Sequence, residues 1–258
     1  MKWMKPFLAV AIGVMLFTPS AVTASTDVKT PRLMEGTTPV PAALLLNSYR
    51  FMGKLKSFSI DAVTTSDDTY LDEMVVTYTH WVHIDLKRPN KLHISVTGDL
   101  KSKEYYIDNS SFTVYDALTN YYGKLEVPQG VDKALDFLFE KYDVKSPLAN
   151  LLYRDLDRRI PPKTKGIYFG VSDVDDVPCH HIGFYSATHE FQVWIEEGKR
   201  PLIRKFIIVD KTEPYLPRSG TVLKWKLNPQ LGDAVFTFQP PEGSVEINIE
   251  PADEWEAQ

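Results

Sequence analysis

Apolar and polar residues alternate one by one through most of this chain, and this alternation limits its fold more than any other feature. The clearest stretch spans residues 78–98, where two apolar runs flank the turn segment Lys87–Lys91. The apolar residues of these runs recur with a period of two: Val82, Ile84, Leu86, Leu92, Ile94 and Val96. Because successive side chains of a strand point to opposite faces, the pattern predicts a hairpin with one apolar face.

The same period recurs along the chain at short intervals. Further strands are predicted at residues 58–63, 103–108, 111–116, 120–127, 167–173, 177–186, 189–196, 201–209, 220–227, 234–239 and 244–249. Short polar turns separate many of them, which favours antiparallel neighbours. We therefore expect a mainly β, α+β protein with a sheet of roughly 11 strands. The charged segment 155–165, which contains two consecutive prolines, is expected to be an exposed connection.

Helical spacing is confined to a few short segments. Residues 41–56 and 131–142 carry apolar residues three and four positions apart. Ser146, followed by Pro147, is a suitable N-cap for a short third helix that ends near Tyr153. Because a sheet of this length is rarely flat and open, we expect it to curve into a partly closed barrel whose concave face is covered by the helices. Such an arrangement leaves room for a cavity between the sheet and the helices.

The first 24 residues have the pattern of a secretory signal peptide. Two lysines precede a short apolar run, and small residues lead up to Ala24, after which we expect cleavage. The apolar run is too short to span a membrane comfortably. No cysteine lies near its end, which argues against a lipid anchor. The pattern predicts a free periplasmic protein.

The rest of the chain is predicted to form one domain. Residues 25–40 are expected to be a flexible leader, residues 41–249 a single domain, and residues 250–258 an acidic tail. The formal net charge of −5 argues against nucleic acid as a partner, since binding to phosphates depends on clustered lysines and arginines. A single cysteine cannot form an intramolecular disulfide, so stability must come from packing.

The only cysteine, Cys179, is followed directly by His180 and His181. On a strand, Cys179 and His181 share one face, and His180 lies on the other. A zinc site needs three or four converging ligands, more than this stretch supplies. A thiolate nucleophile needs a base facing it, which a sequence does not show. We favour a small buried packing residue, with metal or redox chemistry as the open alternative.

Other residues give little support for catalysis or metal binding. His80 and His83 are expected on opposite faces of a strand, and His83 and His93 on a solvated outer face. The acidic run 172–176 lacks the glycine and the distal glutamate of a calcium loop. Neither a nucleophile elbow nor a phosphate loop occurs, and the strand aromatics are interpreted mainly as packing residues. The chain is therefore predicted to be no enzyme, with no metal and no cofactor.

A series of short motifs occurs in a fixed order from residue 41 to about residue 245. They are Lys56–Asp61 after the first helix, Lys87–Leu92 with Gly98–Asp99, Tyr105–Tyr106 with Tyr115–Asp116, Asn120–Tyr122, Val177–Cys179 with His181, Trp194–Glu196 with Gly198, Arg200–Leu202, Trp225 with Leu227–Pro229, Phe236–Phe238 and Pro240–Gly243. In this order they resemble an uncharacterised family of predicted bacterial periplasmic proteins within the LolA/LolB-like superfamily.

The resemblance implies an unclosed half-barrel of antiparallel strands with helices covering its concave apolar face. Better-known relatives carry lipoproteins across the periplasm or sense envelope stress through lipid-like or peptide signals. The chain departs from these patterns twice: it lacks the lipobox cysteine of anchored relatives, and Asp176 occupies a turn position where glycine is expected. The first departure removes membrane anchoring, and the second concerns only the turn.

The leading functional hypothesis is a periplasmic carrier or binding protein for a hydrophobic ligand such as a lipid, an acyl chain or a lipoprotein. The predicted ligand-binding residues lie on the hairpin and the helices: Val82, Ile84, Leu86, Leu92, Ile94, Val96, Leu135, Leu138, Leu151 and Leu152. The alternative is a protein-interaction module that regulates or senses envelope status through an envelope protein partner. A fold shared with carriers does not decide between these functions.

Overall fold

The computed structural model of the chain describes residues 39–70, 74–144, 148–159 and 166–252, all within the unit that spans residues 31–258. The predicted signal peptide with its cleavage site after Ala24, most of the predicted leader and the end of the predicted tail lie outside the described residues. The same is true of Ser146 and Pro147, the predicted start of the third helix. The division of the chain into these segments stays a prediction.

The strands of the described residues form a single sheet of 12 strands. They are β1 (Ser57–Tyr70), β2 (Met74–Lys87), β3 (Lys91–Gly98), β4 (Lys101–Asp108), β5 (Ser111–Asp116), β6 (Tyr121–Glu126), β7 (Ile167–Val174), β8 (Val177–Tyr185), β9 (His189–Glu196), β10 (Ile203–Asp210), β11 (Arg218–Leu227) and β12 (Val245–Glu246). Their order is β12-β6-β5-β4-β3-β2-β1-β11-β10-β9-β8-β7. Two meanders, β1–β6 and β7–β11, are therefore joined where β1 pairs with β11.

The sheet is not closed, because β12 and β7 form its two edges. Its strand pairs are antiparallel, except that β12 runs parallel to β6. Three α-helices and two short 3₁₀-helices are described besides the strands: α1 (Pro41–Gly53), α2 (Val131–Tyr142), α3 (Leu156–Arg159), η1 (Ala149–Leu152) and η2 (Asp233–Phe236). This arrangement confirms the predicted mainly β, unclosed half-barrel with helices.

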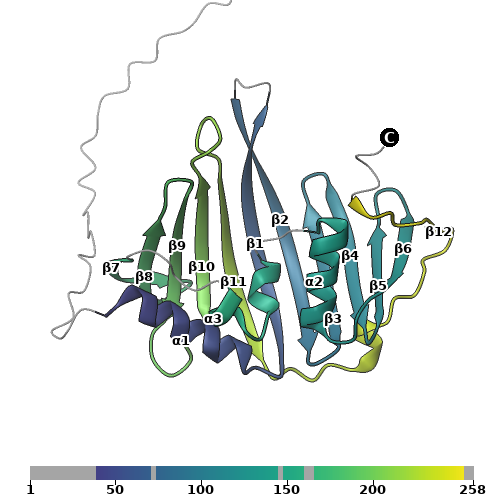
Figure 1. Cartoon of the computed structure of the whole chain (residues 1–258), viewed down its shortest axis with the longest axis horizontal. Coiled ribbons are helices and arrows are strands. Elements are labelled where there is room, and N and C mark those ends of the chain that lie inside the picture. Colours follow the sequence, from purple (N-terminus) through teal and green to yellow (C-terminus); the bar gives the residue numbers. More distant parts are fainter. Residues whose placement is uncertain (1–38, 71–73, 145–147, 160–165, 253–258) are drawn as a thin grey trace, which may run out of the picture. The chain divides into compact units, whose positions relative to one another are not determined.

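The α-helices lie on one face of the sheet (Figure 1). There, α1 crosses the lower ends of β8 to β11, whereas α2 stands lengthwise in front of β3 and β4. We call the face that carries α1 and α2 the inner face and the opposite one the outer face. On the inner face, the predicted alternation is confirmed by the cross-strand pairs Phe58 with Leu86, Ile60 with Ile84, and Ala62 with Val82, all of which are buried.

One expectation for the C-terminal segment was wrong, and two others held only in part. Residues 234–239 form no strand; the chain makes the 3₁₀-helix η2 instead, and the predicted strand 244–249 is reduced to β12. Phe236 is fully buried and Phe238 packs on outer-face tyrosines, so this segment lies across a sheet face, where no strand edge is available for pairing. The expected exposed connection 155–165 contains the helix α3, whose Leu156 is buried.

The turn between β7 and β8 has two residues, Asp175 and Asp176, with φ angles of 48° and 60°. Two-residue hairpin turns of this kind need positive φ at both central positions. Glycine adopts this conformation most easily, but aspartate tolerates it. The departure of Asp176 from the expected glycine therefore leaves the left-handed turn conformation intact.

Candidate functional site

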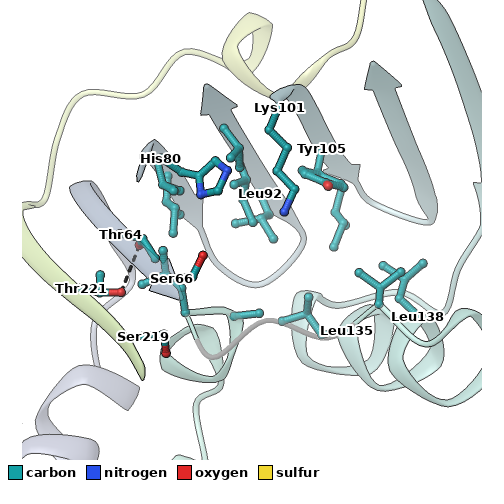
Figure 2. A pocket seen from close by; sticks show the side chains of 18 of the residues that line it. Thr64, Ser66, His80, Leu92, Lys101, Tyr105, Leu135, Leu138, Ser219 and Thr221 are labelled. Atoms are coloured by element: carbon teal, nitrogen blue, oxygen red, sulfur yellow. Dashed lines mark hydrogen bonds between the residues drawn. The ribbon is translucent and has the colours of Figure 1, made fainter. Parts of the chain in front are cut away.

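A cavity of about 340 Å³ lies between the inner face of the sheet and α2 (Figure 2). Its floor comes from neighbouring strands, because side chains two apart on a strand project to the same side. On the helix side it is bounded by α2 and by the chain that leads into η1. The volume falls within the range of about 300–1,000 Å³ that is common for small-molecule pockets.

Most of the predicted ligand-binding residues line this cavity. The structure brings together Val82, Ile84, Leu92, Ile94, Val96, Leu135 and Leu138 around it. Leu86, Leu151 and Leu152 do not line it; they are buried in the core that joins the sheet to the helices. All ten residues lie on the apolar face on which they were expected. Whether such a residue lines the cavity or is buried in the core depends on its position along its strand or helix. A ligand-binding role of all ten residues stays a prediction.

The lining is apolar at one end and polar at the other. Its further apolar members are Tyr105, Ile107, Phe112, Val144, Leu148, Ala149 and Phe206, and its polar members are Thr64, Ser66, His80, Lys101, Ser219 and Thr221. The hydroxyl oxygens of Thr64 and Thr221 lie 3.0 Å apart and share a hydrogen bond. Figure 2 shows the Lys101 side chain extending into the pocket, with the His80 ring beside it.

Sequence reasoning missed these additional residues for different reasons. Phe112 and Phe206 belong to strands with the expected alternation, so the period-two pattern could have found them. His80 was expected opposite to His83, and the structure confirms this: His80 lines the inner cavity, and His83 lies on the outer face. Lys101 gave no signal, because a lysine at a strand end is normally a solvated residue.

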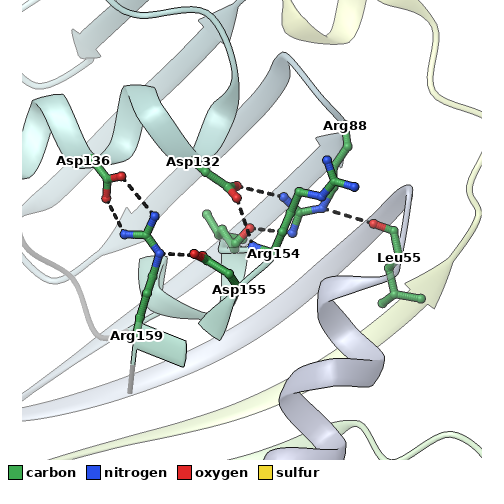
Figure 3. A network of polar contacts seen from close by, with 8 residues as sticks. Leu55, Arg88, Asp132, Asp136, Arg154, Asp155 and Arg159 are labelled. Atoms are coloured by element: carbon green, nitrogen blue, oxygen red, sulfur yellow. Dashed lines mark hydrogen bonds and ion pairs between the residues drawn. The ribbon is translucent and has the colours of Figure 1, made fainter. Parts of the chain in front are cut away.

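Arg88 ties together the elements that frame the cavity (Figure 3). Its side chain is only 6% exposed. Nε donates to the carbonyl oxygen of Leu55 at 3.1 Å, one Nη to Asp132 at 3.1 Å, and the other Nη to the carbonyl oxygen of Leu152 at 2.6 Å. These partners follow α1, begin α2 and end η1. Burial lowers the pKa of Arg88, and the adjacent Asp132 carboxylate opposes that shift.

A second arginine fixes α3 against α2. Arg159 donates from its two terminal nitrogens to the Asp136 carboxylate at 2.6 and 3.0 Å, and from Nε to Asp155 at 2.6 Å. Its guanidinium also lies over the Tyr153 ring, 4.0 Å from the centroid. The hydrogen bonds to Asp136 are the main reason that the pKa of Arg159 is raised. Together, the two arginines hold α2, η1 and α3 in place beside the cavity.

Cys179 lies on the outer face, away from this cavity. It is fully buried in a small cluster with Val174 and Trp194, and its Sγ donates to the carbonyl oxygen of Val177 at 3.3 Å. Burial raises the pKa of the Cys179 thiol to about 12, which keeps it protonated. His181 shares this face as predicted, but it stacks on Trp194 at 3.9 Å between ring centroids. The arrangement supports the packing interpretation of Cys179.

The histidines of β2 and β3 belong to outer-face polar networks. His83 contacts Asp61 through Nδ1 at 2.6 Å and Asp85 through Nε2 at 3.1 Å. His93 stacks on Tyr106, and its side chain is 17% exposed, so only His83 fits the expected solvated face. Among the described residues, no group of histidine, cysteine, aspartate or glutamate side chains is arranged to hold a metal ion.

A groove of about 500 Å³ lies on the outer face of β1, β2 and β3. Trp81 and Val63, which are cross-strand neighbours, are 56% and 41% exposed, respectively. Both line the groove together with the charged residues Asp61 and Lys224. The outer face therefore carries an exposed aromatic residue, separated from the inner cavity by the sheet.

Three solved structures illustrate the similarity of the chain to known proteins. An uncharacterized conserved protein from Thermus thermophilus is 10% identical, with 80% of this chain and 99% of that chain covered and a TM-score of 0.47. The Mycobacterium tuberculosis lipoprotein LppX is 13% identical, with 73% and 95% covered and a TM-score of 0.46. A LolA superfamily protein from Nitrosomonas europaea is 10% identical, with 78% and 99% covered and a TM-score of 0.34.

Comparison with the curated proteins found no match. The helices of the described residues include none long and apolar enough to cross a membrane. One family model matches residues 42–250, a range that includes every strand and α-helix from β1 to β12. This match confirms the family resemblance that the ordered motifs indicate. With most of its length matched, the chain belongs to the family described as predicted periplasmic protein (DUF2092).

Proposed function

We propose that the chain is a periplasmic, non-enzymatic binding or carrier protein for a hydrophobic ligand held in the inner cavity. The observation that carries this proposal is the apolar lining of a cavity of about 340 Å³ between the sheet and α2. A core built only for stability is packed to a density that leaves few voids larger than a water molecule. An apolar space of this size therefore favours a ligand over a purely structural role.

The energetics of such binding are adequate for a carrier. Each methylene group transferred from water contributes about 0.8 kcal/mol, so ten of them contribute about 8 kcal/mol before the entropic losses of binding. The net affinity is then moderate, which suits a protein that must release its ligand. Acyl chains of lipids or lipoproteins have the required apolar length.

The proposed location agrees with the family and with the N-terminus. The family is described as predicted periplasmic, and the first 24 residues have the composition of a signal peptide. An apolar molecule that moves between membranes must cross an aqueous compartment. A cavity that shields it from water lowers the free energy of that passage.

The test is to purify the protein gently from its own periplasm and to measure its mass without denaturation. We expect a bound apolar molecule, and we expect the emptied protein to bind fluorescent fatty acids. Val96→Phe places a larger side chain in the cavity and should weaken this binding at least about tenfold. Val63→Phe makes the same change on the outer face and serves as the matched control. A protein that is always empty and binds no fatty acid would contradict the proposal.

A second candidate is an interaction module for an envelope protein, favoured by the exposed Trp81 in the outer groove. Tryptophan is enriched among residues that dominate protein interfaces. Cross-linking in the periplasm should then capture a partner that Trp81→Ala releases and Val96→Phe retains. Loss of the partner on filling the cavity, with Trp81→Ala harmless, would argue against this function.

A further inference from the structure

The polar end of the inner cavity defines the head group of its ligand. We propose that the ligand is a single-chain amphiphile with an anionic head group, which lies between Lys101 and His80 while its chain follows the apolar lining. This inference rests on the proposed function, because it assigns the ligand class of the same cavity. Figure 2 shows both side chains at one end of the pocket, with Leu135 and Leu138 along the other part.

Lys101 supplies a positive charge that the protein leaves unneutralised. It lines the cavity, and it makes no ion pair within the part of the chain that the structure describes. Its neighbour Lys103 points to the same side of β4, but the ammonium group of Lys103 lies 3.3 Å from the Asp116 carboxylate. Lys101 is the first residue of β4 and is exposed, so its positive charge lies where the pocket meets water.

His80 adds a second polar group at this end of the cavity. Its Nε2 lies 3.0 Å from the carbonyl oxygen of Asp99, and because a carbonyl only accepts, Nε2 carries the proton. The other ring nitrogen, Nδ1, is then an acceptor, and it can take a hydrogen bond from a hydroxyl of the head group, such as that of a phosphate ester. The Asp99 carboxylate accepts a hydrogen bond from the backbone N–H of Thr79 at 2.8 Å, which engages the nearest acidic group on this turn.

The polarity changes in the same direction along neighbouring strands. On β2, His80 is followed on the inner face by Val82 and Ile84, and on β4, Lys101 is followed by Tyr105 and Ile107. The inner faces of β1 and β11 likewise change from polar to apolar toward the core. The order in that direction is Ser66, Thr64, Ala62 on β1 and Ser219, Thr221, Leu223 on β11. Each of these strands therefore presents polar atoms at one end and apolar atoms at the other, as an amphiphile requires.

The size of the cavity favours one chain over several. Its volume of about 340 Å³ is near the lower end of the range for small-molecule pockets. The two-chain and three-chain lipids of membranes and lipoproteins need a larger space. A fatty acid or a single-chain phosphate ester combines the required length with one anionic head.

The experiment compares ligands that share a hexadecyl chain and differ in the head: hexadecanoate, hexadecyl phosphate, hexadecan-1-ol and hexadecyltrimethylammonium. Affinities are measured by displacement of a fluorescent fatty acid from the full mature chain. We expect the two anions to bind about tenfold more tightly than the alcohol, with the cation weakest. The ratio between hexadecanoate and hexadecyl phosphate distinguishes a carboxylate from a phosphate head.

Lys101→Gln should lower the affinity for the anions about tenfold and leave the affinity for hexadecan-1-ol unchanged, which also shows that the variant is folded. Lys226→Gln removes the same charge from an exposed outer-face position and should change neither affinity. Equal binding of all heads to the wild type would overturn this inference while the proposed function stands. Tighter binding of dihexadecanoyl phosphatidylglycerol than of hexadecanoate would overturn the single-chain assignment. If no hexadecyl compound binds, the proposed function itself fails.

Discussion

The helices α1 and α2 cover the same face of the sheet in two different ways. α1 crosses the strands and inserts Leu45, Tyr49 and Met52, which are large residues and at most 4% exposed. α2 lies lengthwise, and the middle of its buried stripe is the small Ala134. No residue of α1 is among those that line the cavity, whereas α2 contributes two. Both helices are amphipathic, so side-chain size and crossing direction, rather than the apolar pattern, decide whether space remains beneath a helix.

The two helices are also held by different forces. α1 is held mainly by burial of its apolar stripe, and its C-terminal Gly53 lets the backbone at Arg154 approach closely: a Cβ there would lie 2.1 Å from the Arg154 carbonyl oxygen. α2 is held at its N-terminus by the polar contact of Asp132 with Arg88. A polar tie fixes a helix without requiring that the space below it be filled. This difference can be tested by removing each kind of support.

Arg88→Met should produce the largest loss of stability. It removes a buried cation, deprives two carbonyl oxygens of their donor and leaves Asp132 with only the backbone N–H of Arg154, so we expect the free energy of unfolding to fall by about 3–5 kcal/mol. Urea unfolding measures this change. Arg159→Met, which breaks a more exposed pair, is the control and should cost about 1 kcal/mol or less. Equal losses for the two variants would show that Arg88 is not the special support of α2.

Met52→Ala and Leu135→Ala test the packing beneath the two helices. Met52 is 2% exposed, and its truncation should lower the free energy of unfolding by about 2–5 kcal/mol. Leu135 is only partly buried and already borders the cavity, so its truncation should cost about 1 kcal/mol. The measurement is urea unfolding without ligand. A larger loss for Leu135→Ala would mean that the α2 region depends on tight packing after all.

The sequence predicted the elements of this fold better than their contacts. Period-two alternation located β1 to β11 because each strand has one buried face, and helical spacing located α1 and α2 for the same reason. It failed for residues 234–239, where apolar alternation is present but no sheet edge is available. Whether an apolar segment finds a pairing partner depends on long-range arrangement, which local periodicity does not contain.

The candidate site was predictable in kind and only partly in position. The inner-face residues of β2 and β3 followed from alternation, but Leu151 and Leu152 are predicted to bind the ligand, whereas the structure buries them beside the cavity in the core. Lys101 and His80 could not be assigned to the site, because a polar residue at a strand end has the same pattern whether it faces water or a ligand. The role of Arg88 was equally hidden, since its partners are mostly backbone carbonyls.

Experiments on Cys179 test whether the sheet behind α1 is tightly packed on its outer face as well. Cys179→Ser places a hydroxyl in the cluster with Val174 and Trp194 and should lower the free energy of unfolding by about 1–2 kcal/mol. In the wild type, the buried thiol, with its pKa raised to about 12, should react with iodoacetamide only on unfolding. Rapid alkylation under native conditions would show that this face opens, and the contrast with the α2 region would weaken.

The smallest effects on stability are expected from His83 and His181, which lie on the outer face behind the α2 and α1 regions, respectively. Their contributions should depend on pH in opposite directions. Burial lowers the pKa of both rings, but hydrogen bonds from His83 to Asp61 and Asp85 outweigh it, so the pKa of His83 is raised above 6.5 while that of His181 is lowered. The stability from His83 is therefore complete below pH 6.5 and is lost as the pH rises through its raised pKa. That from His181 is present above pH 6.5 and is lost as the pH falls toward its lowered pKa.

Titration of the imidazole resonances by NMR measures both pKa values directly, with His83→Gln and His181→Gln to assign the signals. We also expect His83→Gln to lower the stability mainly on the acidic side of pH 6.5, by a small amount because 43% of the His83 side chain is exposed. His181→Gln should instead reduce the loss of stability on acidification, since the variant has no partly buried ring to protonate. If both pKa values lie above 6.5, or both below it, the outer face does not differ between the two regions. The contrast between a tightly packed α1 region and a more polar α2 region would then be limited to the inner face.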